Sequence, residues 1–356
     1  MLTDDLDYDL PPELIAQVPI EPRNAARLLV DRGPGLTPID SHVSELHELI
    51  LAGDVLVVNE TRVLPARIAI HRLTGAAGEV LLLKVHSGAD HSWEALCRPS
   101  RKLAVGEIVT ADAGDLQLRM ETDLGEGRWI VTPLQDGVAI GGDRLLDALA
   151  VSGVMPLPPY ITEVLEDQDR YQTLFANRVA SAAAPTAGLH FTGTVIDAVT
   201  AQGASIHTVE LVVGLDTFRP ITAKTVEDHE IHTEWYRVPE QTWTAVEEAK
   251  RSGGRVVAVG TTSVRALESR ATSGRSSGDT ALFIYPGYDF KVVDVMLTNF
   301  HMPRTSLLAM IEAFVGPRWR DIYGAAVERR YRFLSFGDAM ILQRSSNGAS
   351  SAGVAS

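Results

Sequence analysis

The chain has 356 residues, of which 45% are hydrophobic and 22% charged, as in ordinary folded proteins, and no apolar run is long enough to span a membrane. Its single cysteine, Cys97, excludes an internal disulfide and any site within one chain that needs several thiolates. The formal net charge of −14 argues against a nucleic-acid partner, because phosphate neutralisation dominates such binding.

The charges are, however, unevenly distributed along the chain. The N-terminus, MLTDDLDYDL, is acidic, which is the opposite of a secretory signal, so we expect a cytoplasmic protein. Arginines gather between residues 318 and 332, and a smaller basic cluster covers residues 98–102. An RNA-binding enzyme needs only one basic face, although each cluster could equally be a solvated surface.

The first 61 residues include a buried strand, VLVVN, at residues 55–59. Before it, Arg23 and Arg27 are four residues apart and would share a face if that segment were helical. From residue 62 to about 151 the chain changes to short apolar runs separated by Gly, Asp and Ser, with a helix-like DRLLDALA near the end. Short strands at this spacing predict a small antiparallel barrel or sandwich.

Residues 152–343 alternate apolar runs with helical segments. The clearest helix is PEQTWTAVEEAKRSGG, with Pro239 near its start and Gly253 at its end. This alternation predicts a mixed, largely parallel α/β domain, which the strand at residues 55–59 joins. The fold class is therefore α/β, with residues 1–61 and 152–343 as the main domain, residues 62–151 as an inserted small antiparallel β-barrel, and residues 344–356 as a disordered tail.

The segment APTAGLHF, residues 184–191, holds a hydroxyl, a glycine and an imidazole in an almost uncharged turn. Pro185 fixes one backbone angle and Gly188 permits conformations closed to other residues. Thr186 and His190 supply the polar chemistry, so the segment is typical of a shaped loop at a ligand. A helix start with a buried, hydrogen-bonded histidine is the structural alternative.

In RVVAVGTTSVRALES, a strand is followed by Gly260 and then by a helix that begins with hydroxyls. Thr261, Thr262 and Ser263 lie where a helix N-terminus exposes free amides, which suits a carboxylate or phosphate. Plain N-capping is the alternative. The pattern G-x-G-x-x-G is absent from the sequence, so a Rossmann dinucleotide site has no support.

The segment HEIHTE offers His229, His232 and Glu234 at close spacing. Zinc is one interpretation, but the spacing is not H-E-x-x-H and no cysteine assists, so catalytic or substrate contacts are favoured and we expect no metal. Simple surface histidines remain an alternative.

In TNFHMP, Asn299 and His301 follow an apolar strand, at the position where α/β sheets bind ligands. A capped turn with a buried histidine would explain them equally. In NETRVLPAR, Arg62 and Arg67 flank the expected domain junction. They could hold a substrate carboxylate or an RNA phosphate, or they could pair with acidic residues of the chain.

These segments, together with MPLPPYI at residues 155–161, resemble the S-adenosylmethionine:tRNA ribosyltransferase-isomerases of queuosine biosynthesis, in the same order and from about Tyr8 to Met340. The resemblance implies an α/β domain with an inserted β-barrel. It also implies transfer and isomerisation of the ribosyl part of S-adenosylmethionine, a co-substrate here, onto 7-aminomethyl-7-deazaguanine at the wobble position of tRNA. The products would be epoxyqueuosine in tRNA, adenine and methionine, with no metal required, and we expect a monomer.

That reaction needs groups that titrate near neutrality and donors that position the donor molecule. The proton-transfer candidates are His190, His229, His232 and His301. The candidates for binding S-adenosylmethionine are Thr186, Gly188, Gly260, Thr261, Thr262, Ser263 and Asn299. The candidates for binding the acceptor are Arg62, Arg67, Asp216 and Glu234.

The turn GLDTFRP departs from the family pattern, with Leu215 and Asp216 where Ala and Gly are usual. A carboxylate there would narrow a pocket and add charge. One alternative is therefore a paralogue that runs the same sulfonium chemistry on a free deazapurine nucleoside or another small amine. A second alternative, a non-catalytic RNA-binding module, does not explain the histidine-bearing segments.

Overall fold

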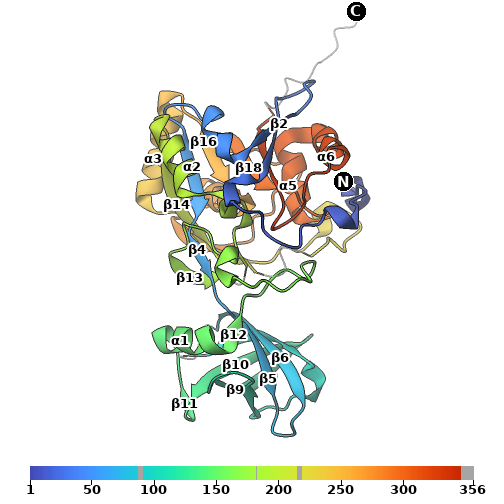
Figure 1. The fold of residues 1–356 in the computed structure, drawn as a ribbon, viewed down its shortest axis with the longest axis vertical. Helices are drawn as coiled ribbons and strands as arrows, with labels where there is room; N and C mark the ends of the chain where they lie inside the picture. Colours follow the sequence, from blue (N-terminus) through green and yellow to red (C-terminus); the bar gives the residue numbers. More distant parts are fainter. Residues whose placement is uncertain (87–90, 182, 215–218, 346–356) are drawn as a thin grey trace, which may run out of the picture.

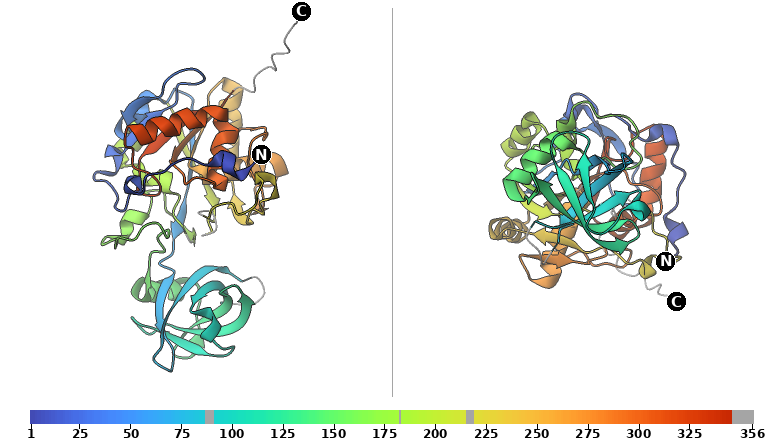
Figure 2. Two further views of the ribbon diagram at one scale, coloured as in Figure 1. Left: turned by 90° about the vertical axis from the view of Figure 1, so that its right-hand side faces the viewer. Right: turned by 90° about the horizontal axis from the view of Figure 1, so that it is seen from below.

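The computed structural model describes residues 1–86, 91–181, 183–214 and 219–345. A larger α/β body carries the chain's N-terminus, and a smaller β-rich unit lies below it in the view of Figure 1. Figure 2 shows from the side that a narrow connection joins the two, and from below that the smaller unit closes into a barrel.

The α/β body is built on one nine-stranded sheet. In spatial order its strands are β17 (Ser277–Thr280), β15 (Glu234–Arg237), β14 (Ser205–Leu211), β3 (Val55–Asn59), β16 (Val256–Val259), β18 (Val295–Asn299), β19 (Ala339–Gln343), β1 (Arg27–Val30) and β2 (Ile39–His42). The central strands β14, β3, β16 and β18 pair in parallel, so their carboxyl ends lie at one edge. The outer pairs β14–β15, β15–β17, β18–β19 and β1–β2 are antiparallel.

Alternate residues of the central strands face two separate apolar cores. Val55 and Val57 of β3 pack in one core, which also contains residues of α3 (Glu240–Ser252), α4 (Thr261–Ser273), α5 (Ser306–Val315) and α6 (Trp319–Glu328). Leu56 and Val58 pack in the other, with α2 (Gly193–Ala201) and the 3-10 helix η4 (Val43–Glu48). Both faces of the strand are buried, which explains why its first four residues, VLVV, are all apolar.

The smaller unit is an antiparallel barrel with its own core. Its strands are β5 (Arg67–His71), β6 (Ala77–Val85), β7 (Trp93–Arg98), β8 (Ile108–Ala111), β9 (Gln117–Gly125), β10 (Arg128–Gln135) and β11 (Val138–Ala139). The barrel closes because β9 pairs with both β8 and β10. Helix α1 (Gly142–Ser152) packs against it and leads into β12 (Gly153–Val154), which pairs with β5.

The connection between the two bodies leaves from the carboxyl edge of the sheet. Strand β3 continues directly into β4 (Thr61–Val63), which pairs in parallel with β13 (Arg178–Ser181), and β5 of the barrel follows. The barrel is therefore attached on the side where the parallel strands end. Ligand sites of α/β sheets occur at this edge, so the connection lies beside the expected site.

The predicted fold class, a mixed α/β domain with an inserted antiparallel barrel, is confirmed, with parallel pairing concentrated at the centre of the sheet. The helical spacing considered for Arg23 and Arg27 is wrong. Arg23 opens a short 3-10 helix and Arg27 opens β1, since the intervening turn ends in extended backbone at Ala26. Cys97 is buried in β7, where burial raises the pKa of its thiol to about 12, so it packs rather than reacts.

Candidate active site

Two adjoining pockets lie at the carboxyl edge of the central strands. We call the first the threonine pocket, because five of its lining residues are Thr186, Thr261, Thr262, Thr298 and Thr305. Its empty space, including the part open to solvent, is about 620 Å³. The second, the histidine pocket, has an empty space of about 550 Å³ counted in the same way, and is lined by His229, His232, Glu234, Arg265 and Phe283, among others.

The two pockets meet at the start of α4. Thr261, Thr262 and Leu307 line both of them. Gly260, which precedes the helix, has φ +86° and ψ 152°, a conformation that side chains other than hydrogen rarely permit. Helix α4 therefore begins at the wall that the two pockets share, and the first amides of a helix, which have no partner within it, suit an anionic group.

The three hydroxyls at this helix start differ in their surroundings. The Ser263 hydroxyl donates to the Val259 carbonyl at 2.8 Å and lines neither pocket, so it serves the helix. Thr261 is buried and faces both pockets. The Thr262 Oγ1 is buried without a hydrogen-bond partner within the part of the chain that the structure describes. A buried hydroxyl costs free energy until it is paired, so Thr262 is ready to contact a ligand.

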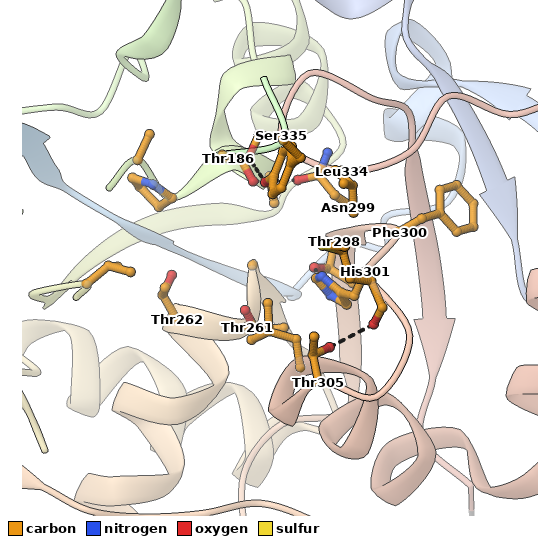
Figure 3. A pocket seen from close by; sticks show the side chains of 18 residues that line it. Thr186, Thr261, Thr262, Thr298, Asn299, Phe300, His301, Thr305, Leu334 and Ser335 are labelled. Atoms are coloured by element: carbon orange, nitrogen blue, oxygen red, sulfur yellow. Dashed lines mark hydrogen bonds between the residues drawn. The ribbon is translucent and has the colours of Figure 1, made fainter. Parts of the chain in front are cut away.

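Asn299 fixes the polar geometry of the threonine pocket. Its Oδ1 accepts from the Thr186 hydroxyl at 2.9 Å, and its Nδ2 donates to His190 Nε2 at 3.1 Å and to the Asp338 carbonyl at 3.2 Å. Because the proton of Thr186 is directed at Asn299, the hydroxyl oxygen presents lone pairs to the pocket. Figure 3 shows Thr186 and Asn299 beside each other in the wall of this pocket.

His190 lies behind this network and does not line the threonine or the histidine pocket. It is 4% exposed, and burial lowers the pKa of its imidazole to about 4, with the charges of Arg332 and Arg23 acting in the same direction. Its Nε2 accepts the proton of an amide, so the ring is neutral and protonated on Nδ1. In this geometry His190 orients Asn299, and through it Thr186.

His301 does line the threonine pocket, on the loop after β18. Burial lowers the pKa of its imidazole to about 3, and its Nε2 lies 3.3 Å from the Thr298 hydroxyl. The backbone is held from both sides, since the His301 carbonyl accepts from the Tyr8 hydroxyl at 2.5 Å and its amide donates to the Tyr323 oxygen at 3.1 Å. His301 is therefore a neutral, fixed hydrogen-bonding group.

The histidine pocket has a different character, because water reaches its histidines. His229 is half-buried, packs edge-on against Phe283, and has its pKa lowered by burial and by His232. His232 is exposed. Behind them Glu234 pairs with Arg265, whose guanidinium also donates to the carbonyls of three neighbouring residues: His232 at 2.9 Å, Leu282 at 3.0 Å and Thr280 at 3.2 Å. This buried ion pair forms a rigid, polar floor.

The remaining candidates lie elsewhere. Gly188 packs against the side chain of Thr173 and lines neither pocket. Arg67 pairs with Glu79 of the barrel at 2.9 Å. Arg62 is exposed on β4 and lines an open groove of about 1180 Å³ between the connection and α1. Asp216 and its neighbour Leu215 lie outside the described residues.

Sequence reasoning did not single out several lining residues. The Tyr160 and Ser335 hydroxyls lie 2.6 Å apart, and both residues line the threonine pocket. Tyr160 belongs to MPLPPYI, one of the segments that carry the family resemblance, whereas Ser335 lies in no such segment. Arg265 lies within GTTSVRALES, one helical turn after Thr261, so its place on the pocket side follows from helix spacing.

Among the described residues, the structure holds no group of three or more His, Cys, Asp or Glu side chains arranged for a metal ion. No helix within those ranges is long and apolar enough to cross a membrane.

Known proteins resemble this chain over nearly its whole length. Residues 3–342 match the family described as queuosine biosynthesis protein. An S-adenosylmethionine:tRNA ribosyltransferase-isomerase of Rubrobacter xylanophilus is 50% identical over 344 residues, which cover 96% of this chain and 98% of that protein. The crystal structure of an S-adenosylmethionine tRNA ribosyltransferase from Thermotoga maritima is 34% identical, with a TM-score of 0.54, over 95% of this chain and 99% of that one.

Proposed function

Because this chain belongs to the queuosine biosynthesis protein family, we propose that it is an enzyme that transfers and isomerises the ribosyl part of S-adenosylmethionine onto tRNA. The observation that carries the proposal is the pair of pockets that share Thr261 and Thr262. A reaction between two large substrates needs two binding spaces that meet where the new bond forms.

S-adenosylmethionine occupies the threonine pocket in this proposal. Thr186 and Thr262 offer hydroxyls to the ribose and the adenine, and the first amides of α4 suit the methionine carboxylate. The described lining residues include no Asp, Glu, Lys or Arg, so an uncharged wall surrounds the sulfonium. Such surroundings favour loss of the cation's positive charge, as occurs when methionine leaves as a neutral thioether.

The acceptor base occupies the histidine pocket. Phe283 offers an aromatic wall for a flat base, and the Glu234–Arg265 pair offers polar atoms at its edge. The aminomethyl group of a 7-deazaguanine must be neutral to attack. His229 and His232 line this pocket and are also accessible to water, so they are the groups placed to take its proton. They accept protons, while His301, Asn299 and His190 hold the donor side of the site in place.

The experiment is incubation of the enzyme with S-adenosylmethionine and tRNA that carries 7-aminomethyl-7-deazaguanine at the wobble position. We expect release of adenine and methionine and a nucleoside with the mass of epoxyqueuosine. The same tRNA with ordinary guanine at that position is the matched control and should release no adenine. Absence of adenine release with the modified tRNA would refute the proposed function.

The net charge of −14 favours one second candidate, a free deazapurine nucleoside as acceptor. The same assay with the free nucleoside in place of tRNA distinguishes the two acceptors. In either case we propose that the enzyme works in the cytoplasm, without a metal and as a monomer, and a measurement of molar mass in solution tests the last point.

A further inference from the structure

A buried carboxylate and two exposed arginines form a fixed cluster beside the domain connection. Glu210, at the end of β14, is 1% exposed. It accepts from Arg178 at 2.7 Å and from Arg237 at 2.9 Å, and their side chains are 53% and 48% exposed. The guanidinium carbon of Arg178 also lies 5.3 Å from the centre of the Trp235 ring.

This cluster has an excess of positive charge. Two guanidiniums face one carboxylate, so the group carries a net charge of +1 in a chain of −14. Each arginine uses one nitrogen for Glu210, and no other hydrogen bond of either guanidinium is found among the described residues. The other N–H groups of both guanidiniums are held in place, because Glu210 anchors both side chains and the Trp235 ring lies under the guanidinium of Arg178.

The cluster lies directly behind the histidine pocket. Leu211 and Glu234 line that pocket, while Glu210 and Trp235, their neighbours in the chain, point to the opposite face of the β14–β15 ladder. Arg178 comes from β13, which is part of the connection to the barrel. Arg178 and the pocket thus share the carboxyl edge of the sheet, and this edge is the path along which a polymer whose base occupies the pocket would reach the arginines.

We propose that Arg178, Arg237 and Trp235 form a surface that binds phosphates of the RNA backbone next to the nucleotide that is modified. The inference rests on the proposed function. Planar guanidiniums with free donors match phosphate oxygens in pairs, and an aromatic ring beside them can support a ribose or a base. The buried Glu210 orients the arginines and does not contact the RNA.

Binding of tRNA as a function of salt tests the proposal, because each phosphate contact contributes to the slope of log affinity against log salt concentration. The variant R178Q/R237Q/E210Q removes both arginines together with the carboxylate that they neutralise. We expect its slope to be smaller by about 1.4 for two lost contacts, with weaker tRNA binding and unchanged S-adenosylmethionine binding. R251Q, at the exposed end of α3, also removes one net positive charge and is the matched control.

A second variant covers the case in which the triple variant fails to fold. R237Q leaves Glu210 paired with Arg178, and it should lower the slope by about 0.7. R178K/R237K retains the charges and should largely restore the slope. An unchanged slope in R237Q would overturn the inference, whether or not the triple variant folds. Failure of the wild-type protein to bind or modify tRNA would instead refute the proposed function, so the two failures are distinguishable.

Discussion

The two pairs of histidines in the site differ in how far water reaches them. His190 and His301 are buried, and the pKa of each imidazole falls to about 4 and about 3. His229 is half-buried and His232 is exposed. All four are equivalent in the sequence as groups that titrate near neutrality, but burial removes the first pair from that range. The proposed function therefore assigns proton transfer to the two histidines of the histidine pocket and fixed hydrogen bonds to the buried pair.

The largest effect should follow from changing the exposed pair. In H229Q/H232Q we expect turnover to fall by about two to four powers of ten, because a general base typically contributes that much. S-adenosylmethionine binding should change little, since neither residue lines the threonine pocket. Steady-state kinetics and titration with the co-substrate measure the two quantities. H207Q, a substitution of a partly buried histidine on β14 outside both pockets, is the control. If the double variant turned over like the wild type, both residues would be surface histidines with no part in proton transfer.

A smaller effect should follow from changing His190. Substitution by alanine removes the acceptor for Asn299 and frees the Thr186 hydroxyl, so we expect turnover to fall by about one to two powers of ten, more than co-substrate binding weakens. His190→Asn can still accept from Asn299 and should recover most of the rate. The pH dependence of turnover should be the same in both variants as in the wild type. A loss of one limb of that profile would show that His190 transfers protons itself.

The buried pair should also make stability depend on pH. An unfolded histidine has a pKa of about 6.5, so between that pH and about 4 the unfolded chain binds a proton that folded His190 does not. The free energy of unfolding therefore falls as pH is lowered through this range, by up to about 1.4 kcal/mol per pH unit for each histidine. Urea unfolding at pH 7, 6 and 5 measures it. The slope should be smaller in His190→Asn, and equal slopes would contradict the neutral, buried state.

The smallest expected effect is that of a chelator. If His229 and His232 act as proton acceptors, removal of metal ions should leave turnover unchanged. Activity after treatment with a chelator, with and without added zinc, measures this. Loss of turnover that zinc restores would show that His229 and His232 bind a metal ion and would contradict their role as proton acceptors.

The architecture could be predicted from the sequence because its signals are local. The apolar run at residues 55–58, the helix that ends at Gly253 and the closely spaced short strands of the barrel each follow from periodicity and turn residues. The short segment around Arg23 and Arg27 could not be predicted in this way. Two arginines four residues apart fit a helical face, but the pairing of β1 with β19, far along the chain, decides the conformation there.

The candidate site could be predicted only at the level of segments. The motifs located Thr186, Thr261, Asn299 and His301, which the fold brings to one pocket. Burial and direction are tertiary properties, so the sequence could not separate Ser263, which bonds its own helix, from Thr262, whose hydroxyl is unpaired among the described residues. For the same reason it could not place His190 behind the pocket or find Ser335.

In the proposed function, S-adenosylmethionine and the acceptor base occupy different, adjoining pockets. The most direct measurement is a structure of the enzyme with S-adenosylmethionine bound. We expect the ligand in the threonine pocket, in contact with Thr186 and the start of α4, with the histidine pocket left for the base. A ligand confined to the barrel, or one seated between His229 and Phe283, would contradict it.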